Sequence, residues 1–288
     1  MTVLASIWGA LADPWSEPLM RRALVEVVLL GVAGGAIGTW VVLYGLSYGA
    51  ESLSHALLPG LVLAALTGVP LLLGGALGLA AAAVSVTLAG RIPEVGRDTA
   101  IGVVVTAMLG LGVLLALSPR TPAGLDGLLF GDILGVGTGD LVLAGALCVV
   151  LLGALAVLHP SLMVVGFDRL NAGALGRRPA LVELALLALL AAALLVAVQG
   201  LGNLLVVALL VAPAAAARLV TRRLPAMMGT SVAIAISGGV AGLYASYHLG
   251  TAAGASIVAA LVLAYLLAAI AGPFARAGRR RSVAEAGG

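Results

Sequence analysis

The chain has 288 residues, of which 62% are hydrophobic and 9% are charged; it carries fifteen arginines, no lysine and a formal net charge of +3. Soluble domains carry a charge on about a quarter of their residues, so this composition excludes a soluble protein. The positive net charge is therefore not read as a sign of nucleic-acid binding. The missing lysine excludes a P-loop ATPase and a Schiff-base cofactor enzyme, because both chemistries need that side chain. If the protein uses ATP, another subunit must supply the site.

Apolar segments long enough to cross a membrane follow one another along the chain. A helix needs about 20 mostly apolar residues to cross the hydrocarbon layer. The expected spans are residues 23–43, 52–68, 70–90, 99–117, 140–158, 181–199, 202–219, 225–246 and 253–272. Polar and glycine interruptions leave the count at eight to ten. The sequence predicts an all-α, polytopic membrane protein.

Three regions of different composition divide the chain. Residues 1–22 carry Trp8 and Trp15 and predict an interfacial segment rather than a cleavable signal peptide. Residues 23–273 form the expected transmembrane domain, and residues 274–288 form a basic tail.

The arginines indicate the orientation in the membrane. With nine crossings, three gaps and the C-terminal tail fall on one side and hold Arg91, Arg97, Arg169, Arg177, Arg178, Arg218, Arg222, Arg223, Arg276, Arg279, Arg280 and Arg281. The positive-inside rule places this side, and the C-terminus, in the cytoplasm. Arg21, Arg22 and Arg120 fall on the opposite side, and the Arg21–Arg22 pair just before the first span argues the other way.

Glu51 and His55 are the richest pair of polar residues inside the apolar segments. Four residues apart on a helix, their side chains lie on one face. A carboxylate and an imidazole at this spacing can bind one divalent cation, such as Zn²⁺ or Mn²⁺. The alternative is structural: Glu51 favours a helix N-terminus while His55 bonds a neighbouring backbone group.

Three other polar residues are candidates for an ion pathway. Glu26 lies in the first span, Asp132 in a glycine-rich outer segment, and His248 in an outer gap. An inter-helical hydrogen bond accounts for Glu26 as well, a helix cap for Asp132, and solvation for His248.

The gap at residues 166–178 combines a helix-start residue with small side chains and arginines. Asp168 is expected to cap a short helix whose small-residue face packs against a partner. A solvated basic linker is the alternative. The residues expected to make that contact are Asp168, Arg169, Asn171, Ala172, Gly173, Ala174 and Gly176.

Residues 51–60, with Ser54-His55-Ala56 and Pro59-Gly60, resemble the Asp-x-x-Ser-His-Ala-x-x-Pro-Gly signature of the membrane permeases of zinc/manganese-type ABC importers. Other fragments agree with that family in the same order: residues 97–102, 129–134, 200–206 running into 212–218, and 244–247 followed by 254–258. The resemblance covers roughly residues 20–273. Two departures are Glu51, where aspartate is usual, and Val42 to Leu46, where the family has an arginine pair.

The resemblance implies the metal-type ABC importer permease fold and a homodimer in the bacterial inner membrane. Two cytoplasmic ATPase subunits would dock on it, and an extracytoplasmic metal-binding protein would deliver the ion. It also implies that Glu51 and His55 lie on the metal pathway and that residues 168–178 hold the coupling contact. The expected cargo is zinc or manganese, with iron as a further candidate, and no permanently bound cofactor is expected.

Two other functions stay open. A cobalamin- or siderophore-type ABC permease would be larger and would not need the Glu51–His55 pair. An ATP-independent channel or secondary carrier would transport metal without any other subunit.

Overall fold

The computed structural model describes residues 13–89, 92, 97–118 and 131–286, and all its regular elements are helical. A short 3-10 helix, η1 (Asp13–Ser16), precedes the first long helix, and a second, η2 (Ile133–Gly135), lies between α5 and α7. The α-helices are α2 (Pro18–Leu43), α3 (Ser47–Thr67), α4 (Leu71–Ala89), α5 (Arg97–Ala116), α7 (Thr138–Phe167), α8 (Pro179–Leu201), α9 (Asn203–Val220), α10 (Leu224–Leu249) and α11 (Ala253–Ala286).

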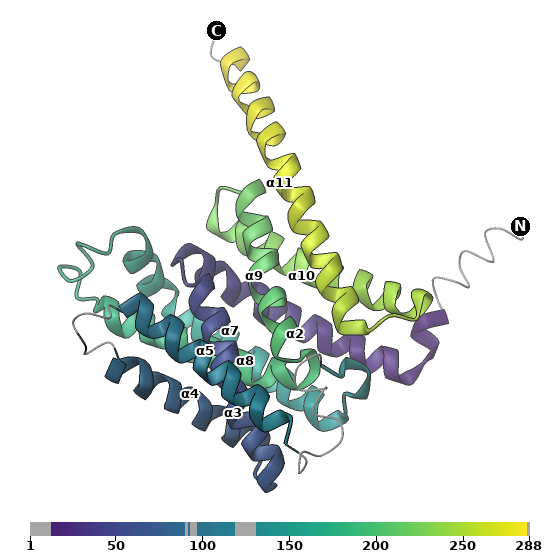
Figure 1. Cartoon of the computed structure of the whole chain (residues 1–288). Helices are drawn as coiled ribbons and strands as arrows, with labels where there is room; N and C mark the ends of the chain where they lie inside the picture. Colours follow the sequence, from purple (N-terminus) through teal and green to yellow (C-terminus); the bar gives the residue numbers. More distant parts are fainter. Residues whose placement is uncertain (1–12, 90–91, 93–96, 119–130, 287–288) are drawn as a thin grey trace, which may run out of the picture.

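These nine α-helices of the described residues confirm the expected all-α architecture and the expected count. Six of them are long and apolar enough to cross a membrane, and α4, α5 and α9 contain shorter apolar stretches. Residues 1–12 of the predicted interfacial segment lie outside the described residues. Arg120 lies outside them as well. The helix α11 extends to Ala286, so the predicted tail continues the last span as helix and projects from the bundle (Figure 1).

The helix α2 is the centre of the bundle. It packs against α7, α8, α9 and α10, while α3 packs mainly against α4 and α5, and α11 packs against α9 and α10 (Figure 1). Close packing at α2 depends on glycine: a Cβ atom at Gly38 would lie only 1.9 Å from the Leu210 carbonyl oxygen of α9. Small residues let helix backbones approach in this way.

Glycine and proline set several helix ends, as their backbone properties predict. Gly68 and Gly250 end α3 and α10 in the left-handed conformation, and proline stands in the first turn of α2, α8 and α10. The predicted end of the fifth span at residue 158 was wrong, since α7 continues through Pro160 to Phe167. A proline inside a membrane helix is tolerated where neighbouring helices stabilise the interrupted turn.

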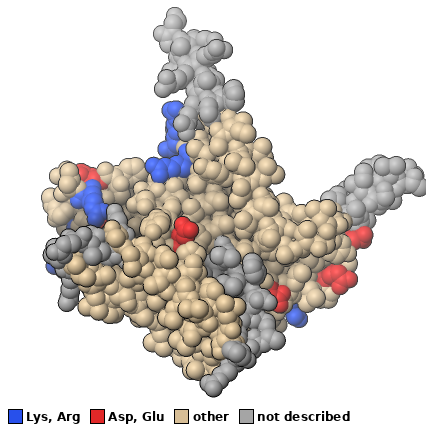
Figure 2. All heavy atoms as spheres, viewed as in Figure 1, with Lys and Arg blue, Asp and Glu red and all other residues tan. Residues whose placement is uncertain are grey.

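One end of the bundle is rich in arginine. The Arg218 guanidinium at the end of α9 donates a 2.9 Å hydrogen bond to the Val42 carbonyl at the end of α2, and the Tyr44 hydroxyl donates to the Leu162 carbonyl near the end of α7. The α2–α3 turn and the 168–178 gap therefore lie at the same end. In Figure 2 most of the blue surface lies beside the base of the projecting part and at the left edge, and a smaller blue patch lies at the lower right.

Candidate functional site

The signature residues lie at the start of α3, directly after a tight turn. Gly45 adopts a φ of +68°, and the Leu46 amide donates to the Val41 carbonyl, which ties the turn to α2. The Ala50 amide then donates to the Leu46 carbonyl and starts the helix. Glu51 and His55 are thereby fixed in the first turns of α3, near the arginine-rich end.

Glu51 and His55 face one another, as their spacing predicts. His55 Nε2 lies 3.9 Å from Glu51 Oε1, and the side chains are 20% and 58% exposed, respectively. The other ring nitrogen, His55 Nδ1, is buried and has no hydrogen-bond partner within the described structure. The pair presents one oxygen and one nitrogen ligand toward the surface of α3.

Proline and glycine shape α3 immediately after this pair. Pro59 has no N–H to donate to the His55 carbonyl four residues earlier, so the helix is interrupted beside the imidazole. Gly60 allows close packing on α4, because a Cβ there would lie 2.0 Å from the Gly74 carbonyl oxygen. The face of α3 opposite Glu51 is therefore packed closely against α4 of the same chain.

The other candidate ligands do not join Glu51 and His55 in a larger cluster. Among the described residues, no group of three or more His, Cys, Asp or Glu side chains is placed to hold a metal ion. Two ligands from one chain are too few for a closed transition-metal site.

Glu26, Asp132 and His248 have separate environments. Glu26 is 2% exposed in α2, and its Oε2 has no hydrogen-bond partner in the described ranges. Asp132 caps η2 by accepting a 3.0 Å hydrogen bond from the Gly135 amide, which is the capping role that the sequence left open. His248, in the last turn of α10, packs its ring against Tyr244 and Tyr247. Their place on an ion pathway stays a prediction.

Asp168 follows the end of α7, residues 169–176 form consecutive turns, and the short helix predicted there is not formed. The Asp168 carboxylate instead stabilises the first turn, since it accepts hydrogen bonds from the Asn171 amide (3.2 Å) and from Asn171 Nδ2 (2.9 Å). The structure does not expose all the small residues that were expected to form the docking face. Ala172 is 0% exposed and faces its own chain, whereas Leu170 is 96% exposed. Gly173 has open space around it, and Gly176 turns the chain with a φ of +71°.

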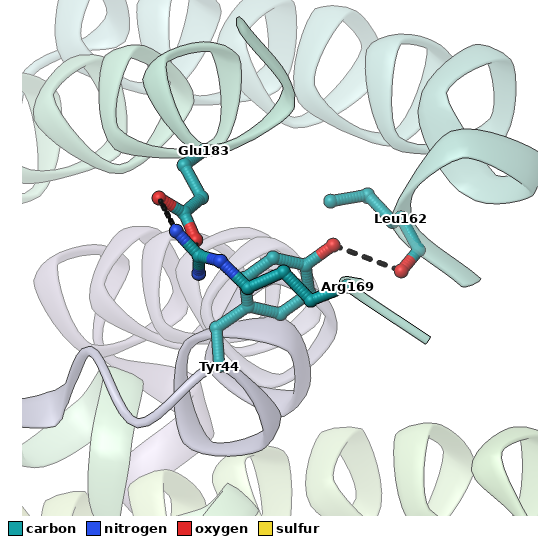
Figure 3. A network of polar contacts seen from close by, with 4 residues as sticks. All are labelled: Tyr44, Leu162, Arg169 and Glu183. Carbon is teal, nitrogen blue, oxygen red and sulfur yellow. Dashed lines mark hydrogen bonds and ion pairs between the residues drawn. The ribbon is translucent and has the colours of Figure 1, made fainter. Parts of the chain in front are cut away.

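A polar network lies at the base of this loop (Figure 3); from the sequence, Glu183 at the start of a span is expected to make an inter-helical hydrogen bond, but its partner is not predicted. Arg169 forms a two-pronged ion pair with Glu183 in the first turns of α8; the second contact, from Nη2 to Oε2, measures 3.1 Å. The Tyr44 hydroxyl donates a 2.8 Å hydrogen bond to the Leu162 carbonyl. Burial, followed by the nearby Glu183 carboxylate, raises the pKa of Tyr44 to about 12, with Arg169 opposing. Tyr44 therefore stays a neutral donor at physiological pH.

The helical bundle, with six helices long and apolar enough to cross a membrane among the described residues, defines a polytopic membrane protein. Residues 16–272 match the model of the ABC 3 transport family, and the chain belongs to this family. It is 31% identical to the manganese import system permease protein ScaB of Streptococcus gordonii, over 91% of this chain and 94% of that protein. It is 30% identical to the chelated iron transport system membrane protein YfeD of Yersinia pestis, over 92% of this chain and 89% of that protein.

A solved structure shares the fold. A chain of PsaBC from Streptococcus pneumoniae in complex with Fab superimposes with a TM-score of 0.84 at 29% identity, covering 91% of this chain and 95% of that chain. The expected importer-permease architecture is thus confirmed.

Proposed function

We propose that this protein is the membrane permease subunit of an ATP-driven importer of divalent transition metal ions, with manganese as the first candidate and zinc and iron as the others. The observation that carries the proposal is the Glu51–His55 pair on an exposed face of α3. Carboxylate and imidazole ligands suit Mn²⁺ and Zn²⁺. Relatives named for manganese and for chelated iron transport support this range of cargo.

The exposure of Glu51 supports a homodimer. A carboxylate on a membrane helix is costly against lipid and usually faces a partner or a water-filled cavity. Other exposed side chains, such as Val149 and Val157 of α7, are apolar and suit lipid. A second copy packed across the Glu51 face of α3 would add its own carboxylate and imidazole. The ion would then have four ligands, two from each chain.

The arginine-rich end supports a cytoplasmic contact with separate ATPase subunits. The chain has no lysine for a P-loop, so ATP must be hydrolysed elsewhere. Leu170, Leu175 and Phe167 are exposed around the 168–176 turns at this end of the bundle. We assign the ATPase contact to these apolar side chains together with Gly173 and Ala174. With this assignment, the proposal puts the C-terminus in the cytoplasm of a bacterium, on the inner side of its inner membrane.

The opposite end would receive the ion from an extracytoplasmic metal-binding protein. Asp132 and His248 belong to this end, and the buried Glu26 lies beside the end of α8, where a Cβ at Gly200 would come within 3.3 Å of its Oε1. Acidic side chains around the entrance of a transport pathway attract cations. We assign these three residues to the outer part of the pathway.

Reconstitution tests this function directly. The permease is placed in proteoliposomes with its ATPase and binding protein, and Mn²⁺ uptake is measured with ATP, without ATP and with the permease alone. Uptake that requires ATP and the other subunits is expected. Equal uptake by the permease alone would identify a channel or secondary carrier instead.

A further inference from the structure

Tyr44 contacts parts of the chain that are more than one hundred residues away. Its hydroxyl is bonded to the Leu162 carbonyl, and its ring lies against Gly166, where an added Cβ would come within 3.1 Å of the ring. Leu162 and Gly166 belong to the last turns of α7, which lead directly into residues 168–176. Tyr44 therefore holds the end of α7 from which this loop emerges.

The ion pair of Arg169 and Glu183 holds the same loop from its other side. Arg169 is the second residue after α7, and Glu183 lies in the first turns of α8. Burial raises the pKa of Tyr44, and the two charges lie close enough to affect that pKa further, Glu183 raising it and Arg169 lowering it. Figure 3 shows the arginine, the glutamate and the tyrosine together where α2, α7 and α8 meet.

The chain between Tyr44 and the proposed metal ligands has little freedom to absorb a movement. The amides of Tyr44, Gly45 and Leu46 are bonded to the carbonyls of α2, and Ala50 is bonded to Leu46. The Tyr44 ring also makes an edge-to-face contact with the Trp40 ring of α2. Displacement of Tyr44 is therefore passed to the turn and then to the first turns of α3, which carry Glu51 and His55.

We propose that Tyr44, bonded to Leu162 and packed on Gly166 beside the Arg169–Glu183 pair, is a positioning residue that links the 168–176 loop to the metal ligands on α3. The inference rests on the proposed function, because it assumes that the ATPase contacts this loop. Closing of the ATPase subunits would displace the end of α7, and Tyr44 would pass that displacement to Glu51 and His55.

The test uses the complete reconstituted complex. Tyr44→Phe removes only the hydroxyl, and Tyr265→Phe, at a partly exposed position of α11, is the matched control. We expect Tyr44→Phe to keep ATPase co-purification and the Mn²⁺ concentration for half-maximal uptake. The maximal rate of uptake and the number of ions moved per ATP should fall by about fivefold, the size expected for one neutral hydrogen bond. Tyr265→Phe should change neither.

A charge exchange tests the ion pair. Arg169→Glu and Glu183→Arg should each lower the ions moved per ATP, and the double exchange should recover most of the loss. If Tyr44→Phe matches Tyr265→Phe, or the double exchange recovers nothing, the inference is wrong.

Leu170→Asp separates this result from a failure of the proposed function. If Leu170→Asp uncouples the complex while Tyr44→Phe does not, the loop contacts the ATPase and only the link through Tyr44 is overturned. If Leu170→Asp has no effect, the ATPase contact itself is misassigned and the inference falls with it.

Discussion

His55 Nε2 faces Glu51 Oε1 at 3.9 Å, but the two side chains differ in exposure: the carboxylate points out from α3 and the imidazole is partly enclosed. The imidazole is therefore the better positioned ligand and the carboxylate the more adaptable one. The length of the carboxylate side chain should therefore affect which ion the pair selects.

Glu51→Asp should retain transport but change its preference among metals. The shorter side chain withdraws the carboxylate by one methylene from the imidazole, which changes the size of ion that both ligands reach. Competition of Zn²⁺ and Fe²⁺ against Mn²⁺ uptake measures the preference. An unchanged order of competition would mean that Glu51 does not contact the ion.

Bulky or charged residues in the 168–176 turns should uncouple the ATPase. Leu170→Asp and Gly173→Trp act on exposed positions and should reduce ATPase co-purification and metal-stimulated ATP hydrolysis. Ala172 is unsuitable for this test, because its side chain is buried in its own chain. Normal association and stimulation in both variants would move the contact to the basic gap at residues 218–223.

The face of α3 that carries Glu51 should lie near its copy in the dimer. In a Cys148→Ala background, which removes the only cysteine, Tyr48→Cys introduces an exposed thiol one turn before Glu51. We expect an oxidant to produce a disulfide-linked dimer. Val157→Cys on the exposed face of α7 is the control and should stay monomeric. The reverse pattern would place the dimer contact on α7.

Gly38→Ala should destabilise the bundle. The new methyl would lie 1.9 Å from the Leu210 carbonyl oxygen, so α2 and α9 would have to separate. Overpacking of this kind costs about 1–3 kcal/mol, which should lower the Tm in detergent. Gly229→Ala is the matched control, because that glycine lies in α10 with open space around it. Equal Tm values for the two variants would contradict the close packing.

The sequence predicted the helices well because their apolar stretches are separated by glycine, proline and arginine. It missed the end of α7, since His159 and Pro160 have the character of a helix end, although Trp40 packs on the His159 ring in the folded chain. Hydropathy cannot report such a contact.

The candidate site was predicted only in part, for a similar reason. The spacing of four residues places Glu51 and His55 on one helix face wherever that helix lies. The burial of Ala172 and the contact of Tyr44 with Leu162 depend on segments distant in sequence. The composition of residues 171–174 suits a short helix. Contacts with the rest of the fold select consecutive turns instead.

The most direct test of the account is ATP-driven Mn²⁺ uptake by complexes that carry Glu51→Ala or His55→Ala. Glu17→Ala, at an exposed acid outside the expected pathway, is the control for loss of a carboxylate. We predict uptake at the level seen without ATP for both site variants, with normal ATPase co-purification, and normal uptake for Glu17→Ala. Normal uptake by either site variant would contradict the assignment of Glu51 and His55 to the metal pathway.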